Sequence, residues 1–133
     1  MIQVLPRQMD SLAALVAMVR DFLRAESLPE RRACDLDLVL EELFANIVRH
    51  GRGTGGVQVE LSPAPEGVRI VLRADEPEAF DPTVSPGVDE GASPEEGLAG
   101  GLGLQLVRRR SREFTYDWSA GAGTTTVLMG VSE

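Results

Sequence analysis

The chain has 133 residues and a formal net charge of −8 at pH 7, and its hydrophobic content of 43% is ordinary for a globular protein. This length fits a single domain, which we expect to span residues 1–133. No apolar run approaches the ~20 residues of a membrane span, the start does not resemble a signal peptide, and the acidic balance disfavours nucleic-acid and membrane binding. A single cysteine (Cys34) and a single histidine (His50) exclude a disulfide framework and a Cys/His zinc cluster. We therefore expect a soluble, cytoplasmic protein.

Two amphipathic helices follow a short β-prone segment at residues 2–5. Asp10 is placed to cap the first helix, which has one apolar face (Leu12, Leu15, Val16, Val19, Phe22 and Leu23). Ser27 and Glu30 have the spacing of a capping box and predict a second helix that continues to about His50.

The second half of the chain alternates apolar and polar residues. Segments 57–61 and 68–74 predict an antiparallel hairpin, and after a long loop a third helix is expected to run through Arg112 into two final strands. The element order β-α-α-β-β-loop-α-β-β predicts an α+β fold of two layers, with helices on an antiparallel or mixed sheet.

Polar residues gather on one face of the second predicted helix. Glu42, Asn46 and Arg49 are spaced by four and three residues, which places them on the same side of a helix. A carboxylate, an amide and a guanidinium so placed could act as a base, a metal ligand and a phosphate contact. The alternative is the ordinary solvated face of an amphipathic helix.

Three further signals, at four positions, indicate chemistry. Asp75 ends a predicted strand. A carboxylate at such a position can accept a hydrogen bond from an exocyclic amine, bind a metal or cap a turn. Gly101 and Gly103 lie in a glycine-rich turn before a helix, which suits either an anion or a hinge. Thr125 follows a Gly-Thr pair in the last strand and is the weakest signal of the three.

The order and spacing of these motifs resemble those of the GHKL ATPase superfamily, which includes gyrase and histidine kinases. ELFANIVRHG at 42–51 resembles its N box, and DEPEAFDP at 75–82 its first glycine box. GGLGLQLV at 100–107 resembles the second glycine box, and GTT at 123–125 the closing Gly-Thr strand. The short length is most similar to that of the bacterial anti-sigma-factor serine-protein kinases.

The resemblance implies a Bergerat fold that binds ATP and Mg²⁺, with helices on one face of a mixed, mostly antiparallel sheet. In it, Glu42 would be the general base toward a serine hydroxyl, Asn46 would ligate Mg²⁺, and Arg49 would lie near the phosphates.

The remaining site residues carry over in the same way. Asp75 would accept a hydrogen bond from the adenine amino group, and Thr125 would lie beside the adenine. Gly101 and Gly103 would offer backbone N–H groups to phosphate. One residue departs from the pattern, because Pro77 stands where the family has a glycine close to the adenine.

The function implied is a partner-switching protein-serine kinase that binds a sigma factor, or phosphorylates an antagonist protein, and that is compatible with a homodimer. Pro77 keeps open the alternative of a non-catalytic partner-binding module with a degenerate nucleotide site. The isolated ATPase part of a histidine kinase is disfavoured, because the sequence has no phosphoacceptor histidine outside the N box.

Two charged segments have competing interpretations. Residues 75–96 carry eight acids and no base, so the loop at about 82–100 is either a lid over Mg·ATP or a solvated loop. Four arginines at the end of the third helix (Arg108, Arg109, Arg110 and Arg112) either offset the helix dipole or dock an acidic partner.

Overall fold

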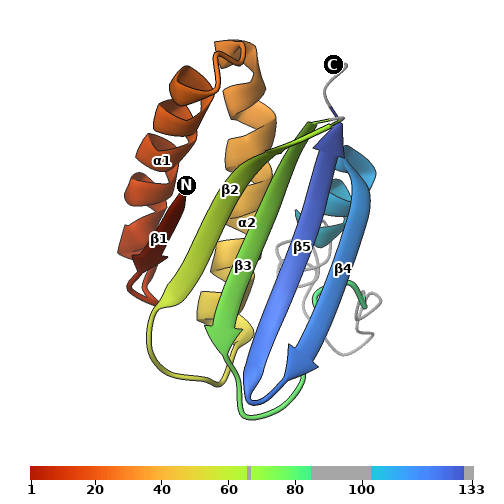
Figure 1. Cartoon of the computed structure of the whole chain (residues 1–133). Helices are drawn as coiled ribbons and strands as arrows, with labels where there is room; N and C mark the ends of the chain where they lie inside the picture. Colours follow the sequence, from red (N-terminus) through yellow and green to blue (C-terminus); the bar gives the residue numbers. More distant parts are fainter. Residues whose placement is uncertain (66, 85–102, 131–133) are drawn as a thin grey trace.

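The computed structural model describes residues 1–65, 67–84 and 103–130. These residues form two layers, a five-stranded sheet and helices packed against one of its faces (Figure 1). The strand order is β1-β2-β3-β5-β4, and each of the four described pairings is antiparallel. The strands are β1 (Ile2–Leu5), β2 (Val57–Ala64), β3 (Gly67–Asp75), β4 (Ser111–Ser119) and β5 (Ala122–Gly130).

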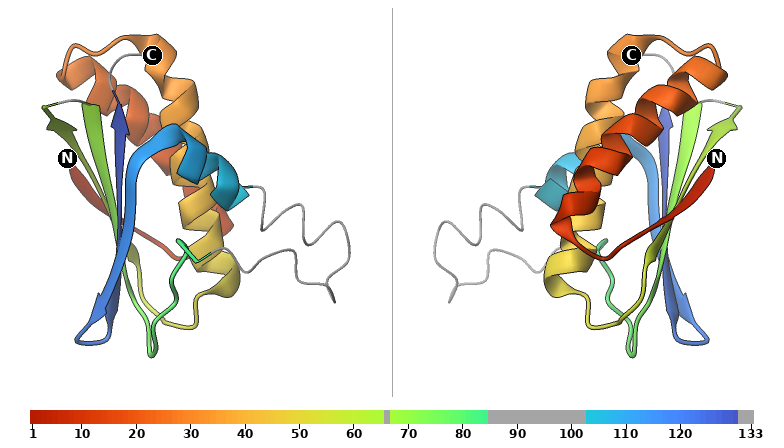
Figure 2. Two further views of the ribbon diagram at one scale, coloured as in Figure 1. Left: turned by 90° about the vertical axis from the view of Figure 1, so that its right-hand side faces the viewer. Right: turned by 90° about the vertical axis from the view of Figure 1, so that its left-hand side faces the viewer.

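The helical layer consists of α1 (Leu12–Ala25), α2 (Ala33–His50) and a third helix of which residues 103–110 are described. Figure 2 shows all three on the same side of the sheet, while no described element covers the other side. The two-layer α+β fold and the element order predicted from sequence are therefore confirmed. The described part of the sheet is antiparallel throughout rather than mixed. The assignment of residues 1–133 to a single domain stays a prediction.

The apolar faces of helices and sheet meet in one core. The side chains that are buried to 2% exposure or less come from every layer (Phe22, Leu36, Leu40, Leu43, Phe44, Leu61, Ile70 and Leu72 among them). Burial on β3 alternates, with Val68, Ile70, Leu72 and Ala74 turned inward. This alternation matters for the site, because it fixes which residue after the strand points toward the helices. None of the helices in the described ranges is long and apolar enough to cross a membrane.

The predicted helix caps are wrong. Asp10 lies inside a 3-10 turn, η1 (Met9–Ser11), and α1 has no side-chain cap at Ser11. Ser27 has a φ of 55°, and the N–H of Leu28 donates to the carbonyl of Leu23, so Ser27 ends α1 in a Schellman motif. A residue in that conformation cannot open the next helix.

The boundaries of the second and third helices also differ from prediction. The second helix starts only at Ala33, after the 3-10 turn η2 (Glu30–Arg32). The third helix ends at residue 110 rather than at Arg112, because β4 begins at Ser111 and pairs with β5. Pairing with β5 satisfies backbone groups that the helix end would leave free.

Candidate functional site

On α2, the side chain of Glu42 lies against Gly103 at the start of the described part of the third helix. Glu42 and Asn46 are half-buried, whereas Arg49 is exposed near the end of α2. Gly103 packs directly on Glu42, and a Cβ added to Gly103 would lie only 1.8 Å from Glu42 Oε2. A larger residue at 103 would have to displace the Glu42 carboxylate, so the predicted phosphate glycine and the predicted base are in direct contact.

The environment of Glu42 changes its acidity. Burial is the largest effect and raises the pKa of the Glu42 carboxyl, and the neighbouring charge of Glu41 raises it further. Arg49 acts in the opposite direction and lowers the pKa. The net result is a pKa above the ordinary value of 4.5, hence a stronger base than a solvated glutamate.

A small pocket lies beside this face, between α2 and the sheet. Its free volume is about 10 Å³, roughly the room of one water molecule. Among the residues that line it are Asn46, Ala74, Glu76, Phe80, Tyr116 and Thr125.

Phe80 and Tyr116 occupy much of this space. The Phe80 N–H donates to the Tyr116 hydroxyl at 3.0 Å. Tyr116 lies across Gly123, where a Cβ would come within 2.5 Å of the hydroxyl oxygen. The pocket is therefore formed but filled by the protein's own side chains.

The carboxylate at this pocket is that of Glu76, not of Asp75. Asp75 is exposed and does not line the pocket, whereas Glu76 is 4% exposed and does. The reason is the alternation of β3, because the inward positions 68, 70, 72 and 74 continue to 76. That signal was present in the sequence and would have favoured Glu76.

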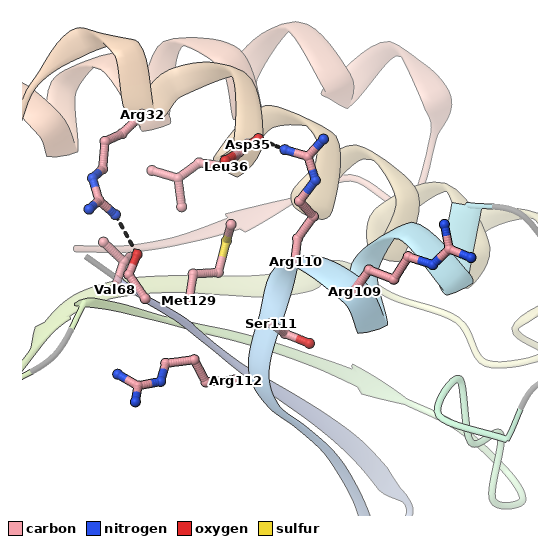
Figure 3. Close-up of a pocket in the computed structure, with 10 residues that line it drawn as sticks. Arg32, Asp35, Leu36, Val68, Arg109, Arg110, Ser111, Arg112 and Met129 are labelled. Carbon is pink, nitrogen blue, oxygen red and sulfur yellow. Dashed lines mark hydrogen bonds and ion pairs between the residues drawn. The ribbon is translucent and has the colours of Figure 1, made fainter. Parts of the chain in front are cut away.

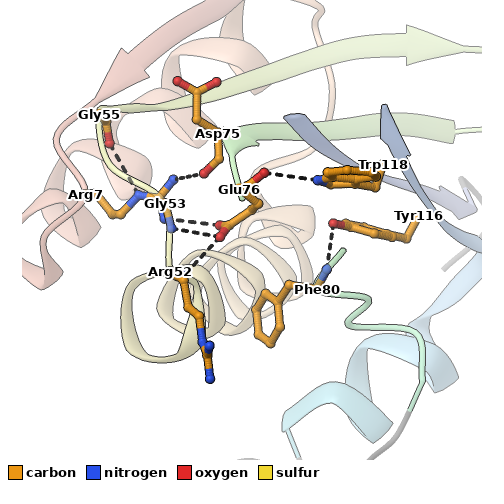
Figure 4. Close-up of polar contacts among 9 residues, drawn as sticks. All are labelled: Arg7, Arg52, Gly53, Gly55, Asp75, Glu76, Phe80, Tyr116 and Trp118. Carbon is orange, nitrogen blue, oxygen red and sulfur yellow. Dashed lines mark hydrogen bonds and ion pairs between the residues drawn. The ribbon is translucent and has the colours of Figure 1, made fainter. Parts of the chain in front are cut away.

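Glu76 is held by a network that joins four segments of the chain (Figure 4). The backbone N–H groups of Arg52 and Gly53 donate to its Oε1 at 2.8 and 2.9 Å. Arg7 Nη1 donates to its Oε2 at 3.1 Å, and the Trp118 indole N–H donates to its backbone carbonyl at 3.1 Å. Both carboxylate oxygens are therefore engaged within the protein.

Arg7 is the central cation of this network. Besides Glu76, it donates from Nη2 to the Asp75 carbonyl at 2.8 Å and from Nε to the Gly55 carbonyl at 3.3 Å. The Arg7 side chain is only 11% exposed, so these contacts form a largely buried latch. Neither the composition nor the residue spacing of the sequence indicated this latch.

The structure brings together most of the predicted site residues. Glu42, Asn46, Gly103 and Thr125 lie around the pocket or on the adjacent face of α2. Gly101 lies outside the described residues, as does most of the predicted lid at 82–100. Sequence reasoning missed Arg7, Glu76, Phe80 and Tyr116 as parts of this region.

A family model of the histidine kinase-like ATPase domain matches residues 5–130. The chain belongs to this family. It thereby belongs to the GHKL superfamily that its motifs resemble, and the predicted superfamily is confirmed. No curated protein sequence matches it significantly.

Three solved structures show the fold. One chain of the SiaB–SiaC complex from Pseudomonas aeruginosa is 18% identical, with a TM-score of 0.60 over 96% of this chain and 87% of that one. The histidine kinase domain of a blue-light-activated kinase from Erythrobacter litoralis is 16% identical (TM-score 0.56, 96% and 62% of the chains). The histidine kinase AdeS of Acinetobacter baumannii is 13% identical (TM-score 0.53, 100% and 68%).

The family implies ATP with Mg²⁺, and the residues fit the two ends of such a ligand differently. At the phosphate end, the Asn46 amide suits a hard cation, and Gly103 leaves its backbone N–H without a side chain of its own beside Glu42. At the adenine end, the side chains of Phe80 and Tyr116 fill the pocket, and the Glu76 carboxylate already accepts hydrogen bonds within the protein. Adenine therefore fits only if these rings move.

Proposed function

We propose that this protein is a partner-switching kinase, which binds Mg·ATP, phosphorylates a serine of an antagonist protein, and binds a sigma factor in its alternative state. The observation that supports this most is the half-buried Glu42, because its raised pKa and its contact with Gly103 are what a base near the phosphates would need. A bacterial, cytoplasmic setting and a homodimer remain part of the same proposal.

The chain's own residues have distinct tasks in this reaction. When bound, Mg·ATP supplies the phosphoryl group. Glu42 accepts the proton of the serine hydroxyl while the serine oxygen bonds to the transferred phosphoryl group, whose bond to ADP breaks so that ADP leaves. Asn46 contributes an amide oxygen to the metal, and Arg49, exposed near the end of the same face, offsets negative charge.

The similarity to one chain of the SiaB–SiaC complex supports the partner-switching part of the proposal. That structure is a complex of two proteins, and its similar chain has the fold described above. Extending a protein partner to this chain is an inference from shared architecture, and the identity of the partner rests on the motif resemblance.

A second function is favoured by the adenine end of the pocket. Phe80 and Tyr116 leave about 10 Å³ free, and both Glu76 oxygens are engaged. Together with Pro77, these features fit a non-catalytic module that sequesters a partner without nucleotide. The kinase function requires the rings of Phe80 and Tyr116 to move aside for adenine, whereas the binding module does not.

Calorimetry with Mg·ATP separates the two functions. The kinase proposal expects saturable binding by the wild type, and tighter binding by Phe80→Ala, because this variant removes one of the two rings that must move to open the pocket. A matched control is Phe114→Ala, which removes a ring that does not line the pocket. If neither the wild type nor Phe80→Ala binds Mg·ATP, the kinase proposal fails and the module remains.

Phosphoryl transfer is the second test. Radiolabelled ATP and a candidate antagonist protein should give phosphoserine on the antagonist, and an antagonist whose acceptor serine is replaced by alanine serves as the control. Binding of Mg·ATP without transfer to any protein would leave an ATP-dependent binding switch and contradict the kinase activity.

A further inference from the structure

A larger cavity lies at the other end of the layered structure, away from the nucleotide pocket. Its volume is about 610 Å³, and it shares no lining residue with the pocket beside Asn46. Figure 3 shows it between the start of α2 and the sheet, where the third helix passes into β4. Leu36, Val68 and Met129 form its apolar floor.

Positive charge dominates the rim of this cavity. Among the described residues, four arginines contribute to the lining, namely Arg32, Arg109, Arg110 and Arg112, against a single carboxylate, Asp35. Asp35 forms an ion pair with Arg110 (Figure 3). A local excess of guanidinium groups is notable in a chain whose net charge is −8.

Arg32 has a donor that the described residues do not satisfy. Its Nη1 donates to the Gly130 carbonyl at 2.5 Å, which fixes the guanidinium at the cavity wall. Its Nη2 is buried and has no hydrogen-bond partner within residues 1–65, 67–84 and 103–130. Buried polar atoms without partners are rare because each one costs free energy, and an anion's oxygen would remove that cost.

Size and chemistry together indicate the class of ligand. The volume lies in the range of small-molecule pockets and the site is concave, unlike a flat protein interface. The guanidinium fork matches phosphate oxygens, and an excess of lining arginines over carboxylates among the described residues favours a compact dianion over a single carboxylate group. The apolar floor can receive a nonpolar part of the same molecule.

We propose that this cavity binds a small molecule bearing a phosphoryl group, with Arg32 and Arg109 among its contacts. The site is separate from the nucleotide pocket, so the proposal stands whether or not the protein is a kinase.

The direct test is a titration of the full chain with pyrophosphate in the presence of EDTA, followed by backbone NMR and calorimetry. EDTA removes the divalent cation on which the nucleotide site is proposed to depend. We expect saturable binding, with shifted amide signals at positions 32, 36, 110 and 130. Shifts at 42, 46 and 125 instead would place the anion in the nucleotide pocket and overturn the proposal.

Three variants sharpen the test. Arg32→Gln should weaken pyrophosphate binding by about tenfold or more, since it removes a charge-assisted bond. The control Arg69→Gln, an exposed arginine of β3 outside the cavity, should change it less than about twofold. Asp35→Asn removes the one carboxylate among the lining residues that the structure describes, and it should tighten binding severalfold. If Arg32→Gln does not fold, the proposal is tested by Asp35→Asn alone. Pyrophosphate binding to Asp35→Asn that is unchanged or weaker than in the wild type would contradict the site.

Two competing ligands test which chemical class of ligand the cavity prefers. Citrate, a small tricarboxylate, should bind more weakly than pyrophosphate, and equal affinity would overturn the preference for phosphoryl groups. A hexaglutamate peptide should also bind more weakly. Tighter binding of the peptide, sensitive to Arg32→Gln, would identify a docking surface for an acidic protein segment and overturn the small-molecule proposal.

Discussion

Glu42 shows how a single residue acquires a chemical property from its neighbours. On an exposed helix face it would be an ordinary carboxylate, but burial between α2 and the third helix raises its pKa. A raised pKa in the folded state means that folding favours the protonated form. Its contribution to stability is therefore present below the ordinary value of 4.5 and is lost as the pH rises through the folded-state pKa.

Glu42→Gln tests the base and its acidity together. Mg·ATP affinity should remain within a few-fold, whereas serine phosphorylation should fall by roughly 10²–10⁴-fold, because an amide cannot accept the proton. In the wild type, the acid limb of the pH–rate profile should lie above 4.5. Denaturation should show the variant gaining stability relative to wild type toward neutral pH. Transfer at the wild-type rate would assign the base elsewhere.

Asn46 is the second residue whose proposed role, that of a metal ligand, depends on its position on α2. It lies one helical turn after Glu42 and lines the small pocket. Asn46→Ala should abolish Mg²⁺-dependent nucleotide binding and leave the circular dichroism spectrum and melting temperature nearly unchanged, because the side chain is only half-buried. Wild-type affinity for Mg·ATP in this variant would show that the metal assignment is wrong.

At the scale of elements, the Arg7–Glu76 latch ties the chain before α1 to the loop after α2 and to the end of β3. Both side chains are largely withdrawn from water, at 11% and 4% exposure. Removing one partner of a buried pair leaves the other charge without compensation, which is much more costly than losing a surface pair.

Arg7→Met should accordingly destabilise the fold by about 3 kcal/mol. The matched control is Arg24→Met, since Arg24 pairs with Asp21 at 75% and 60% exposure and should cost less than about 1 kcal/mol. Urea denaturation measures both. Equal effects of the two substitutions would mean that the latch contributes no more than a surface ion pair.

The segment that follows β3 is the second element with a testable consequence. Pro77 lacks a backbone N–H where the family has glycine, and it lies directly after the latch residue Glu76. If the site is functional, Pro77→Gly should change Mg·ATP affinity by less than about tenfold, or roughly 1.4 kcal/mol. If calorimetry detects no binding to wild type and measurable binding to the variant, Pro77 has abolished nucleotide binding.

At the scale of the whole molecule, one apolar core joins the helices to the sheet. Phe44 has no exposed surface and lies among the core residues from α1, α2 and the strands. Phe44→Ala should lower the free energy of unfolding by about 3–5 kcal/mol through lost burial and the cavity left behind.

Val16→Ala is the control for this substitution, because Val16 is 42% exposed and its loss should cost roughly 0.5 kcal/mol or less. Guanidinium denaturation followed by tryptophan fluorescence reports both variants. A cost for Phe44→Ala close to that of the control would mean that the two layers are held together by contacts elsewhere.

The sequence by itself determined the two-layer fold and its element order. The apolar periods of 3.6 and 2 are local properties of the chain, and they predict helices and strands without knowledge of their partners. The motif order also predicts one site from Glu42, Asn46, Gly103 and Thr125. The structure sets Gly103 against Glu42, and Asn46 and Thr125 around one pocket.

The other features depend on tertiary packing, because they follow from which face each residue presents. That packing turned Asp75 outward and Glu76 inward, placed Tyr116 across Gly123, and brought Arg7 to Glu76 from far along the chain. Long-range contacts of this kind leave no periodic trace in the sequence, and so the latch, the filled pocket and the arginine-rimmed cavity appear only once the layers are packed.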